Sequence, residues 1–299
     1  NFRNIITSKF SEIKIIYPTL ENDNDMVFGN YHFKIPESYD FQLKMYNYEL
    51  VKISLGFKNF FLLDINNLIY NHGYPRDNRL VTNAEFHLSL DFTKKFSKSL
   101  YNFINVLEGK SVKCIILDLD NTIWGGVVGD DGTDGIKIGN YSNGRAFSDF
   151  QFWLKSLKER GIILSICSKN EESIAKDPFL NHPEMILTLD DISVFVANWK
   201  NKVDNIKYIQ SVLNIGFDTI VFLDDNPAER DLVRSGIKDI IVPNLPTDPS
   251  HYRSYLIEQN LFETGNYSNL DKDRTKFYKQ EENRKKALIG SYDIKTYLK

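Results

Sequence analysis

The sequence has few of the features that mark secreted, membrane-bound or nucleic-acid-binding proteins. It holds only two cysteines, both inside hydrophobic runs typical of strands, which excludes a disulfide framework and predicts a reducing, cytoplasmic location. No apolar run approaches the roughly 20 residues that a membrane-spanning helix needs. The net charge of −3 provides no basic surface for nucleic acid or for an anionic membrane.

The amino terminus also lacks the features of a signal peptide and of an initiation site. It contains neither the long apolar core of a signal peptide nor a methionine, which is typical of an excised or processed segment. The 299 residues, of which 42% are hydrophobic and 26% charged, are enough for one large or two ordinary domains. We therefore expect a soluble protein with well-developed cores.

The pattern of apolar residues changes at about residue 110. Before it, strand-like runs at 13–17 and 60–65 flank a helical pattern at 41–55, and another helix is predicted at 90–107. After it, predicted strands (114–117, 162–167, 185–188, 219–223, 239–242) alternate with predicted helices (146–159, 171–176, 202–213, 228–235). This alternation predicts an α/β fold with a parallel sheet. We predict three regions: 1–109, 110–266 and a helical extension at 267–299.

The stretch 112–132 carries the most chemical information. A run of branched apolar residues ends at Asp118, and Asp120 follows two positions later. Side chains at i and i+2 of an extended chain project to the same side, so both carboxylates are expected to face one small volume. Because like charges that close repel, a cation or a shared proton must neutralise them. No Cys/His cluster lies nearby, so Mg²⁺ is the natural candidate.

Polar side chains also follow two other predicted strands. Ser168 comes after the strand at 162–167, and Asp224 comes after the strand at 219–223. Lys200 and Lys202 both lie at the start of the helix between them, and the family pattern described below favours Lys202. Ligands of open parallel sheets bind outside the carboxyl ends of the strands, so these side chains should converge on one crevice. The helix N-terminus at Lys202 would add a favourable environment for anions.

This set of residues predicts phosphoryl transfer through an aspartate. Asp118 would be the nucleophile and form a phosphoaspartyl intermediate, while Asp120 would protonate the leaving oxygen and later deprotonate water. Lys202 would balance the charge of the phosphoryl group. The predicted phosphate-binding residues are Asn121, Thr122, Ser168, Lys169 and Asn170. The predicted magnesium ligands are Asp118, Asp120 through its backbone carbonyl, Asp224 and Asp225.

Cys167 has two interpretations. Its thiol lies next to Ser168, and a thiol at the edge of such a site can carry an acyl group as a thioester. The alternative is a small buried hydrophobic side chain on the strand, which is the commoner role of a free cysteine. We favour the buried side chain.

The order of motifs resembles that of a known superfamily. The sequence DLDNT after a strand, followed by SKN, a lysine and DDNPAER, resembles the haloacid dehalogenase (HAD) superfamily. Longer segments such as DLDNTIWGGVVGDDG and LNIGFDTIVFLDDNPAERDLV resemble its FkbH-like branch, subfamily IIIC, from about residue 112 to 284. The resemblance implies a three-layer, Rossmann-like parallel sheet.

The region before residue 112 is similar to the latter part of the N-terminal domain of that family. Segments such as FFLLDINNLI and GYPRDNRL carry this similarity, which implies a partial SGNH-hydrolase-like α/β domain. The nucleophile block of such a hydrolase would lie upstream of residue 1. His87 stands at the hydrolase histidine position, but Ala84 occupies the place of the expected aspartate. We therefore predict no separate esterase site.

The resemblance also implies a substrate and a partner. FkbH-like proteins transfer a glyceryl unit from 1,3-bisphosphoglycerate to the phosphopantetheine thiol of an acyl carrier protein, with loss of phosphate, in polyketide or polysaccharide biosynthesis. Roughly forty-five residues separate Asp120 from Ser168, and secondary structure uses most of them, so no large cap domain is predicted. An open site suits such a bulky partner. The alternatives are a HAD phosphatase for a small phosphorylated metabolite and a non-catalytic scaffold that binds a carrier.

Overall fold

The protein, seen in a computed structural model, divides into two compact units, Asn1–Tyr101 and Asn102–Lys299. The structure describes residues 13–21, 27–73, 75–84, 88–267 and 278. Nearly all of the predicted C-terminal extension and His87 lie outside these residues. Within the described part of the chain, every helix is too short or too polar to cross a membrane.

The first unit is built on a pair of parallel strands. β1 (Ile15–Pro18) pairs with β2 (Phe60–Leu63), and α2 (Tyr39–Gly56) connects them along the chain. Leu50 of α2 packs on Phe60 in a small apolar core. The other helices that begin in this unit are η1 (Gly29–Lys34), α3 (Ile65–His72), α4 (Asn78–Ala84) and α5 (Leu90–Leu107). The predicted strands and the two predicted helices of this region therefore form.

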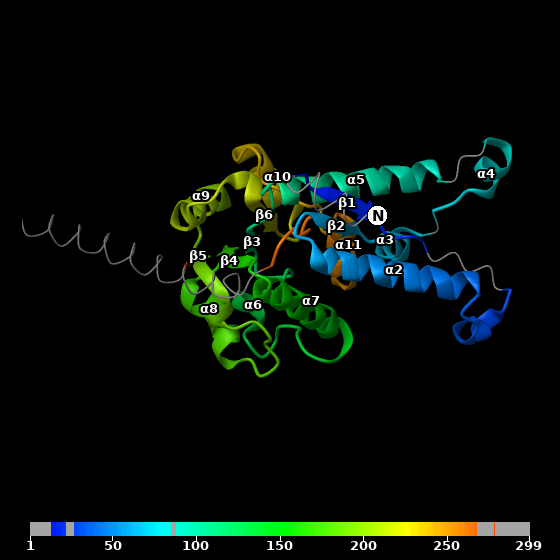
Figure 1. Cartoon of the computed structure of the whole chain (residues 1–299). Helices are drawn as coiled ribbons and strands as arrows, with labels where there is room; N and C mark the ends of the chain where they lie inside the picture. The colour runs from blue at the N-terminus through cyan, green and yellow to red at the C-terminus, as the bar shows by residue number, and fades with distance from the viewer. Residues whose placement is uncertain (1–12, 22–26, 74, 85–87, 268–277, 279–299) are drawn as a thin grey trace, which may run out of the picture. The chain divides into compact units, whose positions relative to one another are not determined.

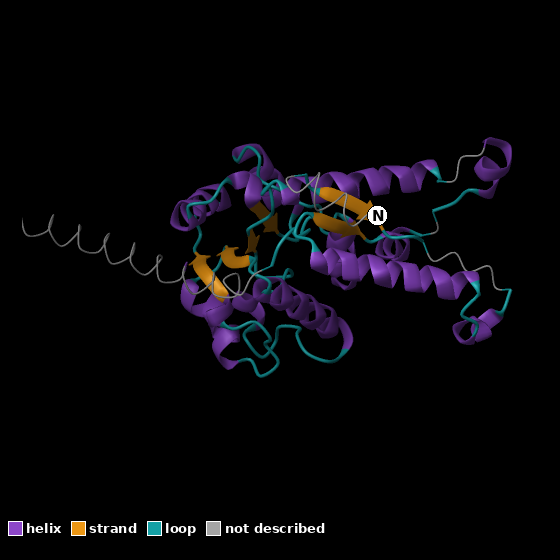
Figure 2. Ribbon diagram, in the orientation of Figure 1, coloured by secondary structure: helices purple, strands orange, loops and turns teal. Residues whose placement is uncertain are grey.

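The second unit contains a four-stranded parallel sheet (Figure 2). Its strands, in spatial order, are β5 (Ile192–Ala197), β4 (Ile163–Ser168), β3 (Cys114–Leu117) and β6 (Ile220–Leu223). Nearly all of their side chains are buried, as expected for strands covered on both faces. The chain runs outward from β3 through β4 and β5 and then returns to place β6 on the other side of β3. β3 is therefore the strand at which the topology changes direction.

Helices cover both faces of this sheet (Figure 1). Ile115 and Leu117 of β3 face one side, where α7 (Ser142–Glu159), α8 (Glu172–Asn181) and α11 (Tyr252–Glu258) contribute to the core. Cys114 and Ile116 face the other side, toward α9 (Lys202–Leu213) and α10 (Pro227–Gly236). This alternation of side chains along a strand places one core on each face. The predicted three-layer α/β architecture is confirmed.

Two strand predictions were wrong. The strand expected at 185–188 does not form, and the edge of the sheet is β5, a few residues later. The Asp191 carboxylate accepts hydrogen bonds from the backbone N–H (2.9 Å) and the hydroxyl (3.0 Å) of Thr188. The backbone N–H groups of Ile186 and Leu187 donate to Gln151 Oε1 over 3.1 Å, so this segment is bonded to side chains and not to a neighbouring strand. The strand expected at 239–242 is reduced to one bridge, between Ile241 and Val221.

Candidate functional site

Three strand ends bring the predicted site residues to one edge of the sheet. Leu117 of β3 lies in register with Leu223 of β6 and Ile166 of β4. The next residue along the chain, Asp118, donates its backbone N–H to the Leu223 carbonyl over 2.9 Å. Because the strands are parallel and in register, the residues that follow them emerge side by side. Ser168 and Asp224 join Asp118 in this way.

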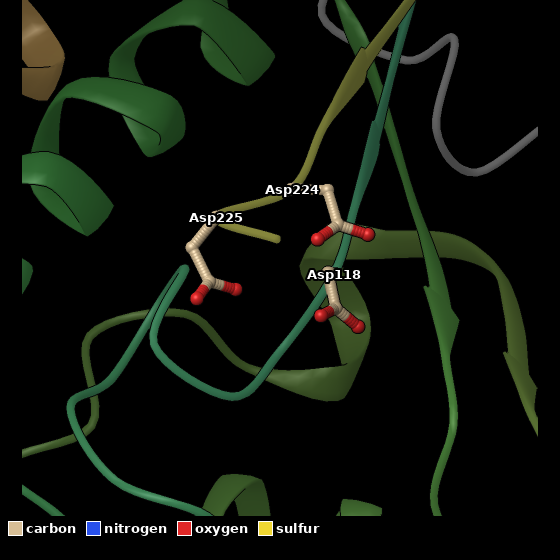
Figure 3. Close-up of side chains that lie close together, drawn as sticks. All are labelled: Asp118, Asp224 and Asp225. Carbon is tan, nitrogen blue, oxygen red and sulfur yellow. The ribbon is translucent and has the colours of Figure 1, made fainter. Parts of the chain in front are cut away.

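Three carboxylates form a tight cluster at this edge (Figure 3). Asp118, Asp224 and Asp225 each offer one oxygen, and these oxygens lie within 4.8 Å of one another. Burial, which the Lys202 charge opposes and the Asp224 charge reinforces, raises the pKa of Asp118 to about 6. Burial also raises the pKa of Asp225, and the neighbouring Asp118 adds to that shift. The cluster therefore concentrates negative charge.

Lys202 supplies the positive charge beside this cluster. Its buried Nζ lies 3.1 Å from Asp118 Oδ1 and 2.5 Å from Asp224 Oδ2. Burial alone would lower the pKa of Lys202, but the charges of Asp118 and Asp224 outweigh it and hold the pKa above its usual range. Lys202 therefore stays charged at neutral pH.

The donor set fits a divalent cation. One ammonium group faces three carboxylates, which leaves net negative charge at the cluster. The buried Oδ1 of Asp118 also has no hydrogen-bond donor, since Lys202 contacts it without hydrogen-bond alignment. Carboxylate oxygens are the ligands that Mg²⁺ prefers, and a cation would compensate the charge.

The side chain of Asp120 lies outside this carboxylate cluster. Its Oδ1 accepts hydrogen bonds from Trp124 Nε1 (2.9 Å) and the Val128 backbone N–H (3.0 Å), and its Oδ2 accepts one from Asn170 Nδ2 (2.8 Å). The expected i, i+2 alignment with Asp118 requires an extended chain, but β3 ends at Leu117 and the chain then turns. Metal coordination by the Asp120 backbone carbonyl stays a prediction.

The predicted phosphate-binding side chains occupy different positions around the cluster. Ser168 and Asn170 are buried, and Asn170 Nδ2 donates to Ser168 Oγ over 3.3 Å as well as to Asp120. The Thr122 hydroxyl accepts a hydrogen bond from the Asp225 backbone N–H (3.2 Å), so it is engaged within the site. Lys169 forms an ion pair over 2.5 Å with Glu229, so its ammonium group points toward α10. Their roles in phosphate binding stay predictions.

Asn121 shapes the turn that follows the nucleophile position. It adopts a left-handed conformation (φ 52°), and its Oδ1 accepts a hydrogen bond from the Gly126 backbone N–H over 2.9 Å. Its own carbonyl accepts a hydrogen bond from the Tyr252 hydroxyl over 3.1 Å. Asparagine tolerates this conformation better than most residues. Asn121 therefore fixes the path of the chain out of the site.

Cys167 is a core residue. Its side chain is fully buried on the face of the sheet that packs against α9, among apolar residues such as Val203. Burial raises the pKa of its thiol far above the ordinary value, so thiolate is scarce at neutral pH. The position therefore favours the interpretation of Cys167 as a small buried side chain over that of an acyl carrier.

We expect iodoacetamide to leave Cys167 and the equally buried Cys114 unmodified in the native protein at pH 7.5. Both thiols should react once urea unfolds the chain, and mass spectrometry of the intact protein measures this. Cys167→Ala should retain the predicted phosphatase activity within about threefold, because no reacting atom is removed. Rapid labelling of Cys167 in the native protein would contradict the core assignment.

Two residues of the site escaped the sequence analysis. Arg230 of α10 is buried, and its Nη1 donates to the backbone carbonyls of Asp224 (2.8 Å) and Asp225 (2.7 Å). Tyr252 of α11 is buried beside Asn121, and burial raises the pKa of its hydroxyl to about 12, with Asp225 adding to the shift. Arg230 lies in the recognised sequence DDNPAER. Its hydrogen bonds to the Asp224 and Asp225 carbonyls, which hold the turn that carries these two aspartates, are visible only in the structure.

Two comparisons with known proteins bear on this site. The family described as "FkbH, N-terminal domain" matches residues 1–105. A crystal structure of the N-terminal part of a Bacteroides fragilis protein, containing a phosphatase domain and complexed with Mg, is 49% identical over 85% of this chain and 68% of that chain, with a TM-score of 0.83. The chain belongs to the family of this phosphatase-domain protein. No curated protein matches it.

Membership of this phosphatase-domain family confirms part of the predicted resemblance. The FkbH match supports the assignment of the N-terminal region, and the structural similarity agrees with a Rossmann-like sheet of the HAD type. Assignment to subfamily IIIC and the SGNH-hydrolase likeness of the first region stay predictions, as do the predicted domain boundaries.

Proposed function

We propose that the second unit is a Mg²⁺-dependent phosphatase that uses Asp118 as its nucleophile. The observation that carries this proposal is the buried Asp118 carboxylate, paired with Lys202 and clustered with Asp224 and Asp225 at the switch point of the sheet. The similar Bacteroides fragilis structure contains a phosphatase domain complexed with Mg, which supports the same chemistry here. Asp118, Asp224 and Asp225 would hold the ion, together with the backbone carbonyl of Asp120.

The reaction would proceed in two displacements. An oxygen of Asp118 attacks phosphorus, the new O–P bond forms, and the bond between phosphorus and the leaving oxygen breaks. Water then attacks phosphorus of the phosphoaspartyl group, which releases inorganic phosphate and restores the carboxylate. Lys202 balances negative charge beside the nucleophile, and bound Mg²⁺ would offset the charge of the carboxylates and the phosphoryl oxygens.

Asp120 would move the protons in both displacements. It would give a proton to the leaving oxygen and later take one from the attacking water. Its carboxylate is held by donors from Trp124, Val128 and Asn170. To reach a leaving oxygen, the carboxyl group must exchange at least one of these hydrogen bonds for the substrate. Positioning of the acid is therefore coupled to the turn after β3.

The proposal includes a more specific substrate and partner. We infer that Asp118 takes the 3-phosphoryl group of 1,3-bisphosphoglycerate, which leaves the 3-hydroxyl free. The phosphopantetheine sulfur of an acyl carrier protein then attacks the C1 acyl carbon, the bond from C1 to the 1-phosphate oxygen breaks, and inorganic phosphate leaves as the glyceryl thioester forms. The FkbH match over residues 1–105 supports this inference. So does the absence of an inserted cap domain between β3 and β6, where every residue is described and the helices α6 (Val128–Asp131) to α9 lie between the strands. An uncapped site leaves room for a carrier-bound arm.

Phosphate release distinguishes the phosphatase from the transferase. The purified chain with Mg²⁺ should release inorganic phosphate from 1,3-bisphosphoglycerate above the spontaneous rate. A phosphopantetheinylated carrier should accelerate release, and mass spectrometry should detect a carrier heavier by one glyceryl unit. Equal phosphate release with and without carrier, together with an unchanged carrier mass, would contradict the transferase proposal and support a stand-alone phosphatase. No release from any phosphate ester would overturn both proposals.

Magnesium should stabilise the metal-free protein. At a concentration of 100 times its dissociation constant it should add about 2.7 kcal/mol to the free energy of unfolding. Thermal melts in EDTA and in MgCl₂ measure the effect. Asp225→Asn should lose most of this response because it removes one carboxylate of the cluster. Asp231→Asn, at an exposed position of α10, is the matched control and should respond like the wild type. An undiminished response in Asp225→Asn would place the ion elsewhere.

A further inference from the structure

Lys169 and Glu229 form an ion pair at the edge of the sheet that carries the carboxylate cluster. Lys169 follows Ser168, the last residue of β4, and Glu229 lies in the first turn of α10, which follows β6. β3 lies between β4 and β6 in the sheet. The pair, with Nζ and Oε1 2.5 Å apart, therefore joins the two flanks of the edge at which Asp118 emerges.

Glu229 is close enough to the site for its charge to act on the same buried thiol. Burial raises the pKa of Cys167 most. The Lys202 charge lowers this pKa, and the carboxylates that oppose Lys202 are those of Asp118, Asp224 and Glu229. Charges act strongly on one buried atom only when they lie near it, so Glu229 is a further carboxylate close to the site.

The two lysines of the site are held very differently. Lys202 is buried between Asp118 and Asp224, and its departure would leave two buried carboxylates without a counter-charge. The Lys169 side chain is 39% exposed, and an ion pair exposed to this extent contributes little to stability. Its ammonium group also sits on a flexible four-carbon stem. Lys169 can therefore exchange its partner, whereas Lys202 cannot.

The position of Glu229 suits a carboxylate that releases a lysine and binds it again. It lies at the N-terminus of α10, where the helix dipole favours a negative charge, so it can stay charged without Lys169. Its side chain is only 15% exposed, and its buried Oε2 has no hydrogen-bond partner among the described residues. A buried carboxylate gains from a cationic partner, which favours the return of Lys169.

We propose that Lys169 is an exchangeable ligand of the phosphoryl group and that Glu229 is its partner before substrate binds. When a phosphoryl group binds at Asp118, Lys169 leaves Glu229 for a phosphoryl oxygen, because a dianion attracts it more strongly than one carboxylate. After hydrolysis Glu229 binds Lys169 again, which weakens the binding of inorganic phosphate and speeds its release. Glu229 is thus a positioning residue that acts through Lys169. The proposal rests on the phosphatase function proposed above.

The affinity of the full chain for inorganic phosphate, measured by calorimetry at saturating Mg²⁺, tests this exchange without turnover. Glu229→Gln should bind phosphate about fivefold more tightly, because Lys169 loses its competing partner. Glu229→Asp, which keeps the charge on a shorter side chain, should fall between the wild type and Glu229→Gln. Lys169→Met should bind phosphate about fivefold more weakly. Asp231→Asn, which removes an exposed ion pair elsewhere on α10, is the matched control and should bind like the wild type.

The double variant shows whether Glu229 acts through Lys169. In the Lys169→Met background, Glu229→Gln should change the phosphate affinity less than about twofold. A fivefold gain in that background would mean that Glu229 repels phosphate directly, and it would overturn the exchange. So would an unchanged affinity in Glu229→Gln, or no binding of phosphate by the wild type.

Phosphate release from esters separates this proposal from the proposed function. Hydrolysis by the wild type without the expected change in Glu229→Gln would contradict the exchange alone. The expected pattern of phosphate affinities without hydrolysis of any ester would contradict the phosphatase alone.

Discussion

Replacing Asp118 by asparagine should lower the rate of phosphate release by at least about 10⁴-fold. The asparagine amide has nearly the same shape but cannot form the phosphoaspartyl group, so the first displacement is lost. Removing one of three clustered carboxylates also relieves repulsion, and Lys202 keeps Asp224 as its partner. We therefore expect a folded protein without phosphatase activity.

Phosphate release from a small ester, measured beside circular dichroism and a thermal melt, checks this prediction. Asp149→Asn is the control, because this aspartate is exposed on α7 and pairs with the exposed Arg145. That variant should keep full activity. Activity within tenfold of the wild type in Asp118→Asn, with a native melting curve, would show that another group attacks phosphorus.

Replacing Lys202 by methionine should destabilise the protein by about 3–5 kcal/mol. The buried carboxylates of Asp118 and Asp224 would lose their only cationic partner among the described residues. For a unit of this size such a loss lowers the melting temperature by roughly 10 °C. Activity should also fall, because the charge of the phosphoryl group would no longer be balanced.

Thermal melts in EDTA measure the Lys202 effect without a compensating metal ion. Lys207→Met is the matched control, since Lys207 is exposed on the same helix and should change the melting temperature little. Adding Asp224→Asn to Lys202→Met should recover part of the lost stability by removing one buried charge. A melting temperature unchanged in Lys202→Met would mean that solvent or ions already compensate the carboxylates.

The sequence was sufficient to predict the side chains that meet at the strand ends. Apolar runs locate β3, β4 and β6, and parallel strands in register deliver the residues after them to one edge, so Asp118, Ser168 and Asp224 converge. Lys202 is predictable for a related reason, because it begins the helix that starts at this edge and runs back along the sheet.

Features that depend on local hydrogen bonds or on contacts between distant residues could not be predicted from the sequence. The segments 185–188 and 192–197 both contain apolar residues. Hydrogen bonds from the backbone of the first segment to the Gln151 side chain, and those between Thr188 and Asp191, keep it out of the sheet. The carboxylate of Asp120 is directed by the turn that follows it rather than by strand alternation. From the sequence alone, Arg230 is an ordinary charged residue of a helix. Its role depends on its hydrogen bonds to the carbonyls of Asp224 and Asp225, which the sequence does not predict.

The position of β6 in the sheet makes completion of the site a late event in synthesis, because Asp224 and Asp225 follow β6 along the chain. The hydrogen bond between Thr122 and Asp225 spans 103 residues, so it closes a long loop. A ribosome-bound chain that ends before β6 could pair β3, β4 and β5 yet would hold one of the three clustered carboxylates. High affinity for a divalent cation would then appear only when the last strand docks. Measuring the metal affinity of successively longer fragments would show the chain length at which the site is complete.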